Sequence, residues 1–160
     1  MQTVIKEIED KKLNRGKGGE LMRIAMCHFI KCAAIAKLPL EEEHLFYINE
    51  SLLTNLQHPK IEVQEAAKEA FNEFSQFYHT KNEKIKAQIV EKIKSLFDGA
   101  VNSTVVETTR GITLGMGGLA KEVLEDLKTD LFSVLMKNSL LKGKENDDAE
   151  TRKAAVEGLA

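Results

Sequence analysis

Apolar residues recur every three or four positions along most of this chain, which is the spacing that places side chains on one face of an α-helix. The stretch from residue 82 to residue 97 shows this simply, because Ile85, Ile89 and Ile93 lie one helical turn apart. The pattern predicts about eight helices, near residues 3–13, 20–37, 41–57, 61–79, 82–97, 103–120, 122–140 and 148–160.

Glycine, proline and capping residues mark the predicted boundaries. Three glycines within residues 14–19 separate the first two helices. Pro39 ends the second helix, because the residue before a proline leaves the helical region. Ser103 is predicted to cap the sixth helix, and Asp147 or Asp148 the eighth.

A related segment occurs four times along the chain. The copies begin at Leu21, Val63, Val106 and Thr151, so successive copies lie 42, 43 and 45 residues apart. A period in the forties with two helices per unit is typical of HEAT and armadillo arrays. The sequence therefore predicts an all-α fold, a HEAT/armadillo-like α-α superhelix in which helix pairs stack into a right-handed solenoid.

We interpret residues 1–160 as a single HEAT-repeat segment, with the second helices of its repeats near 20–37, 61–79, 103–120 and 148–160. The last repeat stops inside its second helix, which would leave an apolar face uncovered. We therefore expect a fragment of a longer solenoid. Because solenoids mostly hold partners, the expected function is binding.

Small residues indicate where neighbouring second helices approach most closely. They are Ala66, Ala67 and Ala70, with Ala25, Ala154, Ala155 and Gly158 at matching positions. Arg110 occupies the position of Ala67, and we expect its stem to be buried and its charged head to lie in water. His28 falls on the same packed face, which predicts a hydrogen-bonded core histidine.

Composition and charge narrow the class of partner. The chain is 42% apolar and 30% charged, with a formal net charge of −2. Lysines alternate with glutamates and no basic patch is concentrated, so we expect no nucleic acid as a partner. No stretch is long and apolar enough to span a membrane. Cys27 and Cys32 point apart on one helix, which predicts free thiols and a reducing, cytoplasmic location.

Residues with catalytic or metal-binding potential do not form a recognisable site. The glycines between Gly111 and Gly118 lack the order of a phosphate-binding loop, and we expect them to serve close helix packing. The histidines and cysteines lack metal-ligand spacing. We therefore expect no catalytic residues, no metal and no cofactor.

One segment departs from the pattern of a solvated helix. Between Thr108 and Ala120 the only charged side chain is Arg110, and Met22 and Met26 give the second helix a similar apolar edge. Two interpretations stay open, namely burial by further repeats and contact with a partner. The candidate partner-binding residues are Met22, Met26, Arg110 and Ile112.

Several short motifs resemble one protein family. They are Gly18-Gly19-Glu20-Leu21-Met22-Arg23, Ile48-Asn49-Glu50-Ser51-Leu52, Thr109-Arg110-Gly111 leading to Leu114-Gly115 and Leu119, and residues 149–155. Together they are similar to the C-terminal part of the tubulin-specific chaperone D family, also called tubulin-folding cofactor D. The resemblance covers roughly residues 18–160, and the acidic turn at residues 41–43 looks short for the family.

The resemblance implies a large HEAT-repeat chaperone that binds β-tubulin and assists assembly and disassembly of the α/β-tubulin heterodimer in the cytoplasm. Members work with tubulin cofactors C and E and an Arf-like small GTPase, and together they promote GTP hydrolysis by tubulin. This chain would then be a non-enzymatic scaffold segment. A generic HEAT scaffold of the phosphatase-regulatory or transport type remains the alternative.

Overall fold

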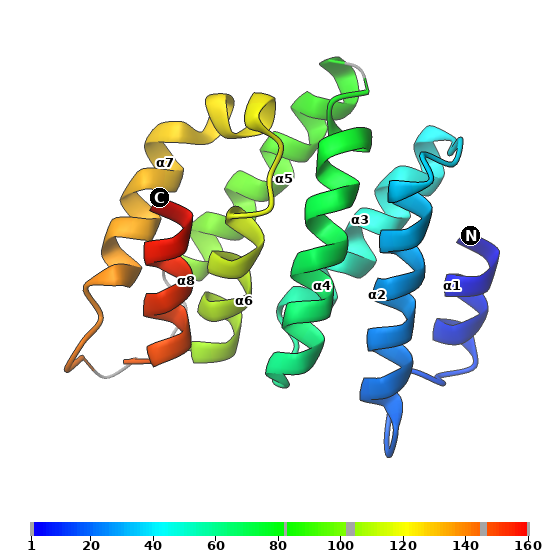
Figure 1. Cartoon of the computed structure of the whole chain (residues 1–160), viewed down its shortest axis with the longest axis horizontal. Helices are drawn as coiled ribbons and strands as arrows, with labels where there is room; N and C mark the ends of the chain where they lie inside the picture. Colours follow the sequence, from blue (N-terminus) through cyan, green and yellow to red (C-terminus); the bar gives the residue numbers. More distant parts are fainter. Residues whose placement is uncertain (1, 82, 102–104, 145–146, 160) are drawn as a thin grey trace.

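The computed structural model describes residues 2–81, 83–101, 105–144 and 147–159, and the ordered elements in these ranges are helices (Figure 1). They are α1 (Gln2–Asp10), α2 (Gly19–Ile35), α3 (Glu42–Leu56), α4 (Ile61–Phe74), η1 (Ser75–His79), α5 (Glu83–Val101), α6 (Val106–Met116), α7 (Lys121–Ser139) and α8 (Ala149–Leu159). The described part of the chain contains no strand, so the all-α prediction is confirmed.

The predicted boundaries are close, and the deviations have local causes. Helix α1 ends at Asp10, before the predicted end, because Lys12 adopts a positive φ of 56° that a right-handed helix cannot continue through. The predicted helix 61–79 changes from α-helical to π-helical geometry after Phe74. The predicted cap at Ser103 lies outside the described residues.

The helices form two layers (Figure 1). Helices α2, α4, α6 and α8 lie side by side, and each contacts the next in the row. Helices α3, α5 and α7 lie behind them, so the chain alternates between the layers. We call the α2–α4–α6–α8 row the front layer. Helix α1 lies at the N-terminal edge and packs against α3, where the Tyr47 hydroxyl donates a hydrogen bond to Glu9.

The core fills the space between the layers. Its largest fully buried side chains include Ile30, Leu45, Phe71, Phe74 and Tyr78. Each such side chain contributes about 1.5–3 kcal/mol when it is removed from water. Two side chains of the π-helical turn η1 form hydrogen bonds with the connections that follow α2 and precede α7. Tyr78 donates its hydroxyl to Leu38 O at 2.6 Å, and Ser75 Oγ accepts from Ala120 N at 2.8 Å.

Helix α6 packs closely against Leu56 of α3 at two glycines, and at Gly111 the neighbouring atom belongs to the backbone. A Cβ on Gly111 would lie 1.6 Å from the carbonyl oxygen of Leu56, and one on Gly115 would lie 2.8 Å from Leu56 Cδ1. The expectation that these glycines serve close packing is confirmed. It also explains why α6 lacks a charged outer face, since helices α3, α4, α5, α7 and α8 all contact it.

The small-residue positions agree with the predicted packing in α4 and α8 but not in α2. Ala67 and Ala155 are fully buried, whereas Ala25 and His28 are exposed. The prediction of a core histidine at position 28 is therefore wrong. In α4, the matching side packs against α2, the preceding helix of the front layer. Helix α2 is the first helix of that layer, so its corresponding side has no front-layer neighbour.

Candidate partner-binding surface

The structure separates the four predicted partner-binding residues into two groups. Met26 is 2% exposed and Ile112 is 7% exposed, so the prediction that they lie on an exposed apolar face is wrong. Met26 shares the inward face of α2 with Ile30, and Ile112 faces the crevice between α3, α4 and α5. Met22 and Arg110 are half-buried, and their contact with a partner stays a prediction.

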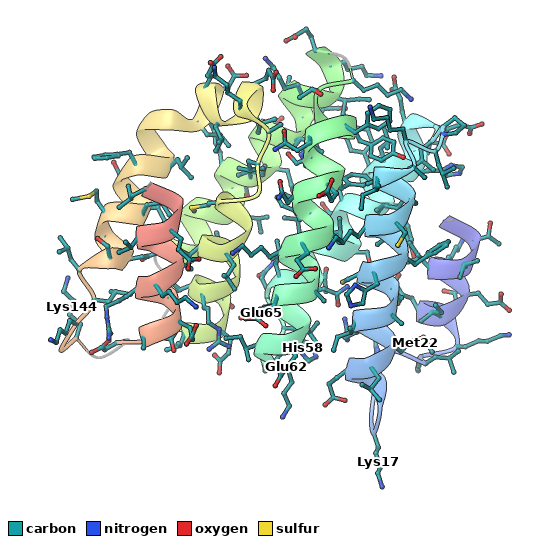
Figure 2. All side chains as sticks on the ribbon, viewed as in Figure 1. Lys17, Met22, His58, Glu62, Glu65 and Lys144 are labelled. Atoms are coloured by element: carbon teal, nitrogen blue, oxygen red, sulfur yellow. The ribbon has the colours of Figure 1, made fainter. Side chains whose placement is uncertain are left out.

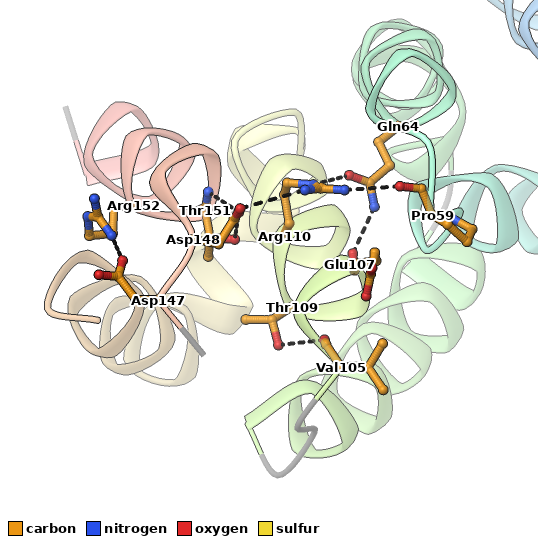
Figure 3. Close-up of polar contacts among 10 residues, drawn as sticks. All are labelled: Pro59, Gln64, Val105, Glu107, Thr109, Arg110, Asp147, Asp148, Thr151 and Arg152. Atoms are coloured by element: carbon orange, nitrogen blue, oxygen red, sulfur yellow. Dashed lines mark hydrogen bonds and ion pairs between the residues drawn. The ribbon is translucent and has the colours of Figure 1, made fainter. Parts of the chain in front are cut away.

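Arg110 is the centre of a polar network that joins three front-layer helices (Figure 3). Its Nε donates to Gln64 Oε1 of α4 at 2.6 Å, and one terminal nitrogen donates to Pro59 O at 3.2 Å. The other terminal nitrogen lies 3.7 Å from Asp148 Oδ1, at the start of α8. Only 12% of the Arg110 side chain is exposed, so the expectation that its head lies in water is wrong.

The partners of Arg110 are themselves fixed. The Gln64 side chain is fully buried and donates from Nε2 to Glu107 O at 2.7 Å, which satisfies both ends of its amide. Asp148 Oδ2 accepts from Thr151 N at 2.8 Å and from Thr151 Oγ1 at 2.6 Å. This confirms Asp148 as the cap of α8. The sequence signal for this network was Gln64 itself, a polar residue on the packed face of α4.

A second arginine serves a similar structural purpose at the N-terminal end of the layer. Arg23 Nε donates to Asn14 O at 3.0 Å, and Arg23 Nη1 donates to Asn55 Oδ1 at 2.6 Å. The bonds connect the loop before α2 to both α2 and α3. In the sequence, Arg23 stood out only as part of the motif at residues 18–23, and nothing there indicated its partner Asn55, which is 1% exposed.

The exposed part of the front layer contains a groove between α4 and α8, with α6 as its floor. Its walls and floor are Ile61, Glu65, Lys68, Leu114, Glu150, Lys153, Ala154 and Glu157. Lys68 and Glu157 face each other across it at 3.8 Å. Glu62 and Glu65 extend from α4 toward solvent (Figure 2). We call this the α4–α8 groove, and its charged walls over an apolar floor suit a protein surface.

Apolar side chains are exposed at two further places. On α7, at the residue that ends it and on α8 they are Phe132, Met136, Leu140, Val156 and Leu159. On α2 they are Leu21, Phe29 and Ile35. Helices α2 and α8 are the two ends of the front layer, so these sets lie at opposite ends of the molecule. Single exposed apolar residues are common on proteins, but these sets add apolar contact area at both edges.

Cys27 is a buried titratable residue of α2. Burial raises the pKa of the Cys27 thiol to about 12, so this thiol stays protonated. Cys27 and the exposed Cys32 are both free, as predicted from their spacing. Within the described residues, no three His, Cys, Asp or Glu side chains are grouped closely enough to hold a metal ion.

His79 is the buried histidine of this fold. It is 1% exposed, and its Nε2 lies 3.0 Å from Asn49 Oδ1. Since that oxygen can only accept, Nε2 carries the proton of the neutral ring, and Nδ1 has no partner among the described residues. Burial lowers the pKa of His79 to about 3. Nothing in its spacing distinguished His79 from the other three histidines.

Among the described residues, every helix is too short or too polar to cross a lipid bilayer. No protein-family model matches the chain, and no solved structure shows significant similarity to it.

Proposed function

We propose that this chain is a non-enzymatic scaffold segment of a tubulin-folding chaperone. In this proposal it forms part of a right-handed HEAT-type solenoid, binds β-tubulin or the α/β-tubulin heterodimer in the cytoplasm, and assists its assembly and disassembly. Tubulin cofactors C and E and an Arf-like small GTPase would act with it. The nucleotide and the hydrolytic residues would belong to the partners.

The observation that carries the scaffold part of the proposal is the neighbour-to-neighbour packing of the front layer. Helix α2 packs on α4, α4 on α6 and α6 on α8, with each intervening helix in the other layer. Such stepwise stacking supports an α-solenoid, in which one row of helices presents an extended surface to a partner. The tubulin part of the proposal is supported by the sequence motifs that resemble the cofactor D family.

The α4–α8 groove is the surface that we propose for the partner. It spans three consecutive front-layer helices, as a solenoid contact does, and its charged residues are carried by helices that the Arg110 network holds in fixed relation. Met22 lies on α2, at the edge of this layer. Arg110 contacts both α4 and the start of α8, so changes at Arg110 would alter the groove through the positions of these two helices.

The test is co-elution of the chain with purified α/β-tubulin in size-exclusion chromatography. We expect an earlier peak that contains both proteins, and a further shift when cofactors C and E and the GTPase are added. Glu65→Lys, at an exposed position in the groove, should reduce co-elution. Glu91→Lys makes the same charge change at an exposed position of α5, in the other layer, and should leave it unchanged.

Three results would contradict parts of this proposal. Absence of co-elution by a chain that is folded by circular dichroism would contradict tubulin binding. Equal co-elution of both variants and the unchanged protein would remove the α4–α8 groove as the contact. GTP hydrolysis by the purified chain alone would contradict the non-enzymatic assignment.

A further inference from the structure

The connection between α1 and α2 concentrates positive charge, in contrast to the mixed charges of the helices. Residues 11–17 contain Lys11, Lys12, Arg15 and Lys17 and no acidic residue. All four side chains are exposed. The connection extends past the ends of the neighbouring helices (Figure 1), with Lys17 at its tip (Figure 2). We call residues 11–18 the basic loop.

The cations of the basic loop are almost free of internal partners. Lys11 forms an ion pair with Glu7 at 2.6 Å, but both side chains are more than half exposed, so this contact holds it weakly. Lys12, Arg15 and Lys17 form no ion pair with a described residue. These three cations are therefore available to an external anion.

The basic loop has a defined backbone conformation, which fixes the points from which these side chains extend. Hydrogen bonds from Leu13 N to Ile8 O, from Arg15 N to Lys12 O and from Gly19 N to Gly16 O close successive turns. Gly16 and Gly18 adopt φ values of 69° and 84°, which glycine accepts without strain.

The base of the loop is anchored in the protein. Asn14 is only 8% exposed, and its carbonyl oxygen accepts from Arg23 Nε at 3.0 Å. The loop backbone is therefore ordered before a ligand binds, which reduces the entropy lost on binding.

The helix that follows adds to the positive potential. No side chain caps the N-terminus of α2, whose N-cap residue is Gly18. The first N–H groups of a helix and its dipole together favour a carboxylate at this position. The exposed Leu13 beside the cations provides a small apolar contact.

We propose that the basic loop and the start of α2 bind a short acidic peptide, a run of Asp and Glu residues in a partner protein. The surroundings favour a short segment over a nucleic acid or an anionic membrane. Glu7 and Asp10 precede the loop and Glu20 follows it, and Glu62 begins the neighbouring helix α4. A long phosphate backbone or a flat bilayer would meet these carboxylates, whereas a few acidic side chains need only the loop. The proposal does not depend on tubulin as the partner.

The experiment measures fluorescence anisotropy of a fluorescein-labelled oligoglutamate peptide titrated with the full chain at low ionic strength. We expect saturable binding that weakens as salt is added, because exposed charge pairs are screened. Arg15→Gln with Lys17→Gln should weaken the affinity by about tenfold. Since Arg15 and Lys17 form no ion pair with a residue that the structure describes, the variant should keep the melting temperature and circular dichroism spectrum of the unchanged protein.

The matched control is Lys142→Gln with Lys144→Gln. It removes the same charge from exposed positions of the α7–α8 connection, at the other end of the molecule (Figure 2), and should leave the affinity unchanged. Equal weakening by both double variants, or no binding by the unchanged protein at low salt, would overturn the proposal. Tighter binding of a single-stranded oligonucleotide, or of phosphatidylserine vesicles, than of the peptide would also overturn it. Since tubulin is absent from this experiment, its failure would leave the proposed scaffold function standing.

Discussion

At the scale of single residues, Gly111 lies so close to the backbone of α3 that no side chain fits at this position. The carbonyl oxygen of Leu56 occupies the space of a side chain at position 111, and the Gln64 amide lies 3.0 Å from the same point. A backbone atom cannot move aside as the end of a flexible side chain can. Helices α3 and α6 can therefore lie this close together only because residue 111 has no Cβ.

Gly111→Ala should accordingly destabilise the fold. We expect a loss of about 3 kcal/mol or more in the free energy of unfolding, because the added carbon forces two helices apart. Urea denaturation followed by circular dichroism measures it. Gly99→Ala is the control, since a Cβ at that helical position in α5 meets no atom within 4 Å and should be neutral or stabilising by up to about 1 kcal/mol. Equal stability of the two variants would contradict the close approach.

A second residue-scale prediction concerns pH. Burial among the rings of Phe71 and Phe74 lowers the pKa of His79 to about 3, below the unfolded value of about 6.5. Between these values the unfolded chain binds a proton that the folded chain excludes. Stability from this group is therefore complete above pH 6.5 and falls as the pH is lowered, by up to about 1.4 kcal/mol per pH unit.

His79→Gln tests this sign. Glutamine keeps an N–H donor for Asn49 but does not titrate, so the free energy of unfolding should depend less on pH between 5 and 6.5 than it does in the unchanged protein. Denaturation at several pH values gives the two slopes. His28→Gln, at an exposed position, is the matched control and should leave the slope unchanged. Parallel slopes for the unchanged protein and His79→Gln would show that His79 is accessible to protons.

At the scale of helices, one carboxylate, that of Asp148, positions α8 through two interactions. Asp148 caps the helix through Thr151 and faces Arg110 of α6 at 3.7 Å. The two interactions can be separated, since asparagine caps a helix about as well as aspartate but carries no charge. The comparison shows whether α8 is held by its cap or by the ion pair.

We expect Asp148→Ala to cost about 1–2 kcal/mol, through loss of the cap and of an anion beside a half-buried arginine. Asp148→Asn should recover most of that loss, because the capping hydrogen bonds to Thr151 are shorter than the contact with Arg110. Thermal unfolding gives the stabilities, and amide exchange in α8 shows whether the effect is local. A stability of Asp148→Asn as low as that of Asp148→Ala would assign the larger share to Arg110.

The sequence predicted where the helices lie along the chain better than it predicted which helices pack against one another. Ile85, Ile89 and Ile93 are buried as their spacing required, because a periodic apolar stripe determines which face of a helix turns inward. The same reasoning failed for Met26 and Ile112, since it could not tell which helix would cover them. It also chose His28 over His79. A π-helical turn after Phe74 rotates the following side chains relative to an α-helix, and no periodicity of 3.6 anticipates that.

The polar contacts of the candidate surface were still less predictable. Arg110 was identified because it interrupts an apolar segment, but its partners come from residues 59, 64 and 148, far along the chain. Only the folded arrangement brings them together. The basic loop was not predicted, since the sequence was taken to contain no concentrated basic patch. Its exposure and its anchoring by Arg23 depend on how α1 and α2 meet.

At the scale of the whole molecule, the front layer is built by successive pairwise contacts, and each helix after the first uses one side for the preceding helix. In α6, Arg110 lies on the side that faces α4, because its partners Gln64 and Pro59 belong to α4 and to the turn before it. Ala67 occupies the matching position of α4 and is fully buried. Ala25 occupies it in α2, where no front-layer helix precedes, and is exposed.

This asymmetry makes one substitution a test of the entire arrangement. Ala67→Glu places an unpaired carboxylate between two front-layer helices and should destabilise the chain by several kcal/mol, enough to unfold much of it. Ala25→Glu makes the same change at the matching position of the first helix and should alter the stability by less than about 0.5 kcal/mol. Melting temperatures of the two variants decide the matter. If both melt with the unchanged protein, the matching positions do not face the preceding helix; if both unfold, the outer side of α2 is covered, and the front layer does not begin there.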